Sequence, residues 1–140
     1  MNEPTTKKFV AVLNKKIEPG RAMNALGHMA AGLAAQFEER EEMRFQDYSD
    51  MEGNIYPSIS DNPFIVLKAK NSNKLKELKK QLVEKNIKHT VFLDTMVEGT
   101  FEDQHERTKS RTEEEIEFWG VCFFAENDTA RELTSKFSIY

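Results

Sequence analysis

Residues 8–37, KFVAVLNKKIEPGRAMNALGHMAAGLAAQF, decide the fold of this chain. The apolar run Phe9–Leu13 does not alternate with polar residues, which is typical of a strand covered on both faces. A polar turn follows and ends at Pro19-Gly20, where proline is tolerated at the start of a helix. The residues after it are rich in alanine and glycine and predict a helix, with an apolar stripe at steps of three and four: Met23, Leu26, Ala30, Leu33 and Phe37.

Three further apolar runs predict strands, namely Phe64–Leu67, Thr90–Leu93 and Phe118–Phe124. A second helix is expected over residues 74–84, and a last helix follows a cap at Asn127 or Asp128. The element order is strand, helix, strand, helix, strand, strand, helix. It predicts an α/β fold in which residues 1–140 form one small three-layer domain with a four-stranded mixed sheet. The strand–helix–strand units should give parallel neighbours, and the last two strands should either pair antiparallel or form an edge return.

Two polar segments interrupt this order. Residues 47–63 are rich in Gly, Asn, Ser and Pro, which predicts a long loop used as a lid, a binding edge or a dimer arm. Residues 96–117 are charge-dense and predict a flexible insertion or a short surface helix. The acidic run of residues 38–42 is expected to extend the first helix into solvent.

Composition narrows the functional classes. The chain has 140 residues, a net charge of −4 and a pI of about 5.5, which does not indicate a general nucleic-acid binder. Its single cysteine, Cys122, lies in an apolar run and is expected to be a core residue in a reducing compartment. No apolar run approaches the roughly 18 residues that span a bilayer, so a cytoplasmic location without membrane contact is expected. The lysines of residues 74–88 form either a solvated face or a phosphate-contact surface.

In open α/β sheets, ligands bind beyond the carboxyl ends of the strands. At that edge the order of elements places the first turn, the start of the first helix and the residues after the third strand. Arg21 would be a fixed cation for a phosphate or carboxylate, and Asp94 would orient water or accept a proton. His28 would be a general base or a hydrogen-bonding partner. The residues predicted to bind the ligand around these three are Asn14, Lys16, Gly20 and Thr95.

Structural interpretations of the same residues stay open, because a histidine on a small-residue helix is often only packed and an aspartate after a strand often belongs to a turn. His89 and His105 lack partners at metal-ligand spacing, and there is no pair of cysteines, so we expect no metal site. The sequence has neither a glycine-rich nucleotide fingerprint nor a serine elbow. We therefore expect no cofactor.

The order of elements, the segment GRAMNALGHMA at residues 20–30 and the segment FLD at residues 92–94 resemble the type II peptidyl-tRNA hydrolases. That family reads Gly-Lys-Gly-Lys before the helix, then Gln-x-x-His-Ala, then Asp-Ala-Gly-x-Thr after the third strand. The positions of this chain that match the family are Gly20, Arg21, His28 and Asp94. A closer likeness is to an uncharacterised conserved family that shares this fold, in which a segment like YPSIS at residues 56–60 precedes the second strand.

Several motif positions differ from the hydrolase pattern. Glu18 and Pro19 replace the first Gly-Lys pair, Ala25 stands in the place of the glutamine, and Glu98 stands in the place of the threonine, with Thr100 two residues further on. The resemblance implies an ester hydrolase acting on peptidyl-tRNA or a related ester. The alternative is a non-catalytic protein that binds a small anionic ligand or a protein partner at the same edge. A third expectation is self-association as a homodimer, the commonest oligomer.

Overall fold

The computed structural model describes residues 3–140, and its centre is a five-stranded mixed sheet. The four predicted strands are present, and a short fifth strand follows the last helix. In spatial order the strands are β5 (His89–Leu93), β6 (Phe118–Glu126), β1 (Lys7–Asn14), β4 (Phe64–Ala69) and β7 (Ser138–Ile139). The α/β class and the mixed sheet are confirmed, and the predicted number of four strands is wrong.

The pairing of the strands differs from the prediction at one position. β1 runs parallel to β4, and β5 pairs antiparallel with β6, as expected. However, β6 also pairs antiparallel with β1, so both β6 and β1 lie between β5 and β4. The second strand–helix–strand unit therefore does not give parallel neighbours. The physical reason is the composition of β6, whose apolar side chains on both faces favour a central place in the sheet.

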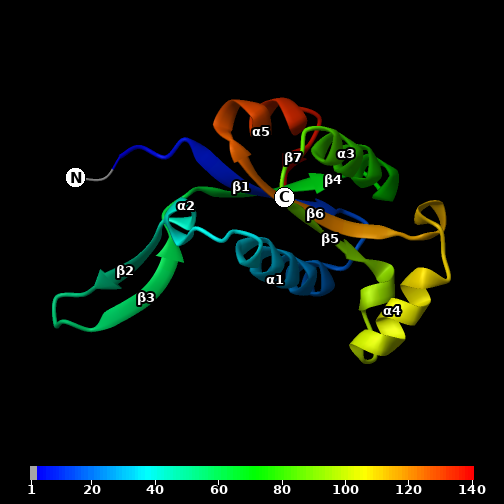
Figure 1. The fold of residues 1–140 in the computed structure, drawn as a ribbon, viewed down its shortest axis with the longest axis horizontal. Coiled ribbons are helices and arrows are strands. Elements are labelled where there is room, and N and C mark those ends of the chain that lie inside the picture. The colour runs from blue at the N-terminus through cyan, green and yellow to red at the C-terminus, as the bar shows by residue number, and fades with distance from the viewer. Residues whose placement is uncertain (1–2) are drawn as a thin grey trace.

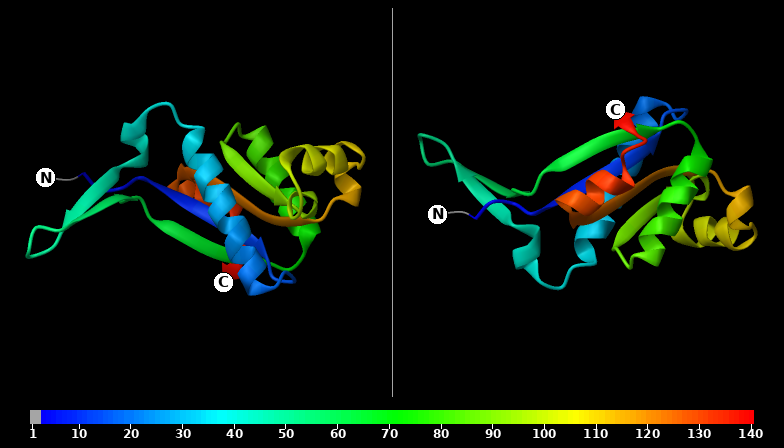
Figure 2. Two further views of the ribbon diagram at one scale, coloured as in Figure 1. Left: turned by 90° about the horizontal axis from the view of Figure 1, so that it is seen from below. Right: turned by 90° about the horizontal axis from the view of Figure 1, so that it is seen from above.

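Helices cover both faces of this sheet (Figures 1 and 2). One face packs against α1 (Pro19–Ala35), and the other packs against α3 (Ser72–Glu84) and α5 (Asn127–Leu133). Side chains along β1 alternate between the two cores, with Phe9, Ala11 and Leu13 toward α1 and Val10 and Val12 toward α3.

The buried face of α1 is made of smaller residues than the sequence predicted. It consists of Ala22, Ala25, Met29 and Leu33, whereas the side chain of Met23 is 64% exposed. The small alanine side chains let α1 lie close to the sheet, and Gly120 of β6 has no side chain that would keep α1 away. A Cβ atom on Gly120 would lie only 2.6 Å from Cε of Met29. The helix therefore packs on the sheet through small residues and a close approach of the two backbones, and not through the predicted stripe of apolar side chains.

The predicted loop of residues 47–63 is largely a β-hairpin that projects from the body of the molecule (Figure 1). The helix α1 ends at Ala35, a short helix α2 (Arg40–Met43) follows, and β2 (Phe45–Ser49) pairs antiparallel with β3 (Ile55–Ser60). The prediction that the acidic run extends α1 is therefore wrong. Asp50 closes the hairpin turn by accepting hydrogen bonds from the backbone N–H groups of Glu52 and Asn54.

The predicted insertion of residues 96–117 is folded. It follows the 3-10 turn η1 (Asp94–Met96) and contains the helix α4 (Phe101–Lys109) and the 3-10 turn η2 (Glu113–Glu115). The predicted helix of residues 74–84 is confirmed as α3, where the side-chain oxygen of Asn71 accepts from the N–H of Lys74 at 3.1 Å. In α5, Asn127 and Asp128 lie inside the helix after Glu126 rather than capping it. Over residues 3–140, every helix is too short or too polar to span a bilayer.

Candidate functional site

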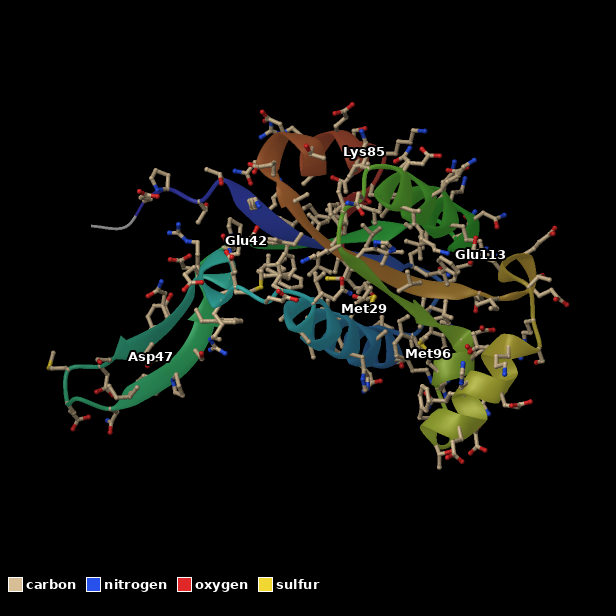
Figure 3. The ribbon with its side chains drawn as sticks, viewed as in Figure 1. Met29, Glu42, Asp47, Lys85, Met96 and Glu113 are labelled. Atoms are coloured by element: carbon tan, nitrogen blue, oxygen red, sulfur yellow. The ribbon has the colours of Figure 1, made fainter. Side chains whose placement is uncertain are left out.

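A cleft of about 490 Å³ lies between α1 and α4, beside β5. Figure 3 labels a residue on each side of it, Met29 on α1 and Met96 in η1. The remaining residues that line it come from the same three regions and are mostly apolar or ring-bearing: Asn24, His28, Thr90, Val91, Phe92, Val97, Phe101, Gln104, His105 and Thr108. Its volume lies within the range of about 300–1,000 Å³ that is usual for small-molecule sites.

The α1 wall of the cleft is fixed against β5. The hydroxyl of Thr90 donates to the backbone carbonyl of Met29 at 2.9 Å, and a Cβ atom on Gly32 would lie 3.4 Å from the Thr90 methyl group. On the cleft side, the ring of His28 lies 5.8 Å from the ring of Phe92, measured between centroids. These contacts place Asn24 and His28, one turn apart on the same helix face, at the edge of the cleft.

The α4 wall is built by a capped helix that is tied to η1. The hydroxyl of Thr100 accepts from the N–H of Asp103, and the Asp103 carboxylate accepts from the N–H of Thr100. This reciprocal cap starts α4. The hydroxyls of Thr95 and Thr108 lie 2.7 Å apart, and the Arg107 guanidinium donates to the carbonyl of Thr95.

Ring side chains and amides give the cleft its chemical character. The Phe101 and His105 rings stack with centroids 5.3 Å apart on the α4 side. Among the described residues, none of those that line the cleft is Asp, Glu, Lys or Arg. Hydrogen bonds to a ligand would come from the side chains of Asn24, His28, Gln104 and His105. The arrangement is suited to a mainly apolar molecule that carries a few polar atoms.

A family described as "Protein of unknown function (DUF2000)" matches residues 7–140. The chain belongs to this family. This chain is similar to a solved structure of a protein of unknown function from Agrobacterium tumefaciens strain C58, with a TM-score of 0.83 and 17% sequence identity. The superposition covers 98% of this chain and 99% of the other. At that identity the likeness shows the fold alone. No curated protein matches the sequence.

In this DUF2000 chain the three predicted catalytic residues do not all line the cleft. His28 lies on its wall, whereas Arg21 and Asp94 are not among the residues that line it. The Asp94 carboxylate accepts from the Arg111 guanidinium at 3.2 Å and from the backbone N–H of Glu117 at 3.3 Å. Those two contacts hold the chain on either side of α4. The catalytic roles of the three residues stay predictions.

The predicted ligand-binding residues at the first turn have partners within the protein. Asn14 is buried, donates to the carbonyl of Phe118 at 3.0 Å and accepts from the N–H of Lys16 at 3.0 Å. The Glu18 carboxylate accepts from the N–H groups of Gly20 and Arg21, both at 3.1 Å. The start of α1 is therefore capped by a carboxylate from the chain itself, at the position where an anionic ligand was expected.

Thr95, the fourth predicted ligand-binding residue, is buried behind the cleft and bonds to Thr108. Sequence reasoning allowed a short surface helix in residues 96–117, but it did not identify this helix as a wall of the cleft. A signal was present in the sequence, because Thr100 followed three residues later by Asp103 has the spacing of a capping box, which marks the start of a helix. Within residues 3–140, no group of three or more His, Cys, Asp or Glu side chains is placed to hold a metal ion.

Proposed function

We propose that the cleft between α1 and α4 binds a small molecule with a planar, mainly apolar body and one anionic group. The observation that carries this proposal is the lining of the cleft, which combines ring and apolar side chains with amides. Arg21 lies one helical turn before Asn24 of this lining, on the same helix. Two aromatic pairs supply flat surfaces, His28 with Phe92 and Phe101 with His105. Offset stacking and edge contacts with such rings favour a planar ligand.

Arg21 supplies the contact for the anionic group. Arg21, Asn24 and His28 follow one face of α1, and Arg21 lies about 4.5 Å along the helix axis from Asn24. Among the described residues, no acidic side chain lies within 4.0 Å of the Arg21 guanidinium, which is exposed to solvent. A guanidinium binds a carboxylate or phosphate through two parallel hydrogen bonds. The ligand body would therefore lie in the cleft with its anion at the mouth.

Matched pairs of acids and neutral analogues test this proposal. We expect at least one of benzoate, indole-3-acetate and AMP to raise the melting temperature, and to bind about tenfold more tightly than benzamide, indole-3-acetamide or adenosine, respectively. Calorimetric titration then measures the affinities. Arg21→Ala should abolish the preference for the acid, and Arg131→Ala, on the opposite face of the sheet, should leave it intact.

A pair of adjacent tryptophan substitutions tests the location. Asn24→Trp should fill the cleft and abolish binding, whereas Met23→Trp, at an exposed position that does not line the cleft, should not. Equal binding by the two variants would place the ligand elsewhere. Binding by none of the six probes to the wild-type protein would contradict the proposed ligand class.

A second candidate function is hydrolysis of peptidyl-tRNA or a related ester. The observation that favours it is the position of His28 on the cleft wall, with Asp94 at the end of β5 and two residues before Met96 of the cleft. Asp94 would orient the attacking water, Arg21 would neutralise the phosphate or the developing oxyanion, and His28 would support both. The lysines of α3 lie on the other face of the sheet, so contact with the tRNA phosphate would rest on Arg21.

Release of the acyl group from a blocked aminoacyl-tRNA measures this activity directly. We expect release by the wild-type protein at micromolar concentration, and a loss of at least about a hundredfold in Asp94→Asn. Lys80→Ala on α3 is the matched control and should keep the rate. Release no faster than background by the wild-type protein would exclude this candidate while leaving the binding proposal in place.

A further inference from the structure

The hairpin of residues 45–60, called here the arm, exposes many large apolar side chains. It projects from the body of the molecule in each view (Figures 1 and 2). A two-stranded hairpin alone is marginally stable in water, and exposed apolar clusters mark interaction surfaces. The large apolar side chains that the arm leaves exposed are Phe45, Tyr48, Met51, Ile55, Tyr56 and Ile59.

Hydrogen bonds hold the arm in a defined shape before any partner binds. At the turn, the Asp50 carboxylate accepts from the Tyr56 hydroxyl at 2.8 Å and from the Asn54 side chain at 2.9 Å. At the base, the Arg44 guanidinium pairs with the Asp61 carboxylate at 2.5 Å. Tyr48 lies directly opposite Tyr56 across the two strands. The arm thus presents a preformed aromatic surface, which reduces the entropy cost of binding.

The arm is also acidic. It carries Asp47, Asp50 and Glu52, and it contains no lysine, arginine or histidine. The carboxylate of Glu52 has no hydrogen bond or ion pair among the described residues. A partner surface that matches the arm must therefore combine apolar contact with positive charge.

Such a surface exists on the same chain, in a groove of about 440 Å³ at the ends of α1 and α3, called here the basic groove. Phe37, Ile87 and Phe124 give it apolar walls, and the ammonium of Lys88 lies 4.6 Å from the centre of the Phe37 ring. The charged side chains that line it are Lys7 and Glu42, which pair with each other at 2.5 Å, and Lys85, Lys88 and Glu126. The lysines in the groove outnumber the glutamates, so the groove carries a net positive charge.

We infer that the partner of the arm is a second copy of this chain, with the arm of each protomer lying in the basic groove of the other. The arm extends away from its own body, so its tip contacts the groove only between copies (Figures 1 and 3). A twofold axis uses each arm and each groove once per protomer. The six exposed apolar side chains on each of two arms would bury on the order of 1,000 Å², close to the roughly 1,200 Å² at which specific interfaces begin.

Sedimentation velocity of the full chain, from about 1 to about 200 µM, tests the pairing. The wild-type protein should form a dimer as its concentration rises. Glu52→Lys in the arm and Lys85→Glu in the groove should each weaken dimerisation by at least about tenfold, because each protomer then meets a like charge. An equimolar mixture of the two single variants should dimerise again, since both contacts are then complementary.

Two controls keep the result specific to these surfaces. Lys80→Glu makes the same charge change on the outer surface of α3 and should leave the dimer unchanged. Met51→Ser, at the fully exposed tip, should weaken the dimer without charge reversal. A wild-type monomer at every concentration would overturn the inference, and so would a dimer that withstands Glu52→Lys and Lys85→Glu or that fails to recover in the mixture.

Discussion

Two stretches rich in aromatic residues form strands in this protein, and they lie in opposite environments. In β6, eight of the nine residues are buried, whereas no residue of β2 or β3 in the arm is buried. The difference lies in their neighbours, because β6 pairs with β1 and β5 and is covered by α1 on one face and α3 on the other. β2 and β3 pair only with each other.

The difference in burial gives the two regions different roles, stability for β6 and binding of a partner for the arm. Burial on both faces means that the side chains of β6 contribute strongly to the free energy of unfolding. The arm contributes few buried contacts, so its side chains are available to a partner. Truncation of buried side chains in β6 should therefore change the free energy of unfolding, and truncation of exposed side chains in the arm should mainly change association.

The largest difference should appear in thiol chemistry. Burial raises the pKa of the Cys122 thiol in β6 to about 12, so its thiolate is roughly a thousandfold rarer than that of an ordinary cysteine. We expect Cys122 to react with a disulfide reagent at pH 8 more than about a thousandfold more slowly than a cysteine introduced by Met51→Cys at the tip of the arm. Absorbance measures both rates. Fast reaction of Cys122 in the wild-type protein would show that β6 opens readily.

Truncation of one side chain in each region should separate their stabilities. Phe123 of β6 is fully buried between β1, β5 and the α3 side of the core, so Phe123→Ala should lower the free energy of unfolding by about 3–5 kcal/mol. Ile59→Ala in the arm should change it by no more than about 0.5 kcal/mol. Denaturation in urea measures both values. A large loss in Ile59→Ala would mean that the arm belongs to the cooperative core.

A methyl group added to a glycine should also cost more in β6 than in the arm. Gly120→Ala would place Cβ within 3.0 Å of the Met29 and Leu13 side chains and should destabilise the protein by about 1–3 kcal/mol. Gly53→Ala meets open space, and its cost of about 1 kcal/mol comes from the positive φ of 88° alone. In a Met29→Ala background, Gly120→Ala should lower the free energy of unfolding by less, because the Met29 side chain that would meet the new Cβ is gone. A double-mutant cycle in urea measures this difference.

Local sequence patterns correctly predicted those strands and helices whose position along the chain does not depend on long-range contacts. The unalternating run at Phe9–Leu13 and the run at Phe118–Phe124 indicated buried strands because both faces of each are covered. The central place of β6 was not predictable, since strand order depends on which faces fit together over long sequence separations. The two strands of the arm were predicted as a loop because Gly53 and Pro57, which indicate a loop, here belong to a hairpin turn and an exposed strand.

The candidate site was predictable only in part. His28 was identified by its spacing on the first helix, and it lines the cleft. The expected anion site at the start of α1 was not recognised as self-capped, because Glu18 reads from the sequence as an ordinary turn residue. Phe101 and His105 form the second wall only because α4 folds back beside α1, a placement that no local periodicity encodes.

Asp50 of the arm should give the smallest effect, a change in stability that depends on pH. Hydrogen bonds from Asn54, and then from Tyr56, lower its pKa from 3.8 to about 2. A carboxyl group whose pKa is lowered by folding stabilises the folded form above its unfolded pKa, and this contribution disappears as the pH falls from about 4 to about 2. Carbon NMR should show Asp50 titrating near pH 2 and the Tyr56 signals shifting with it, whereas Asn54→Ala should return the pKa toward its ordinary value. An Asp50 pKa near 4 in the wild-type protein would mean that the turn is open in solution and that the arm is not preformed for its partner.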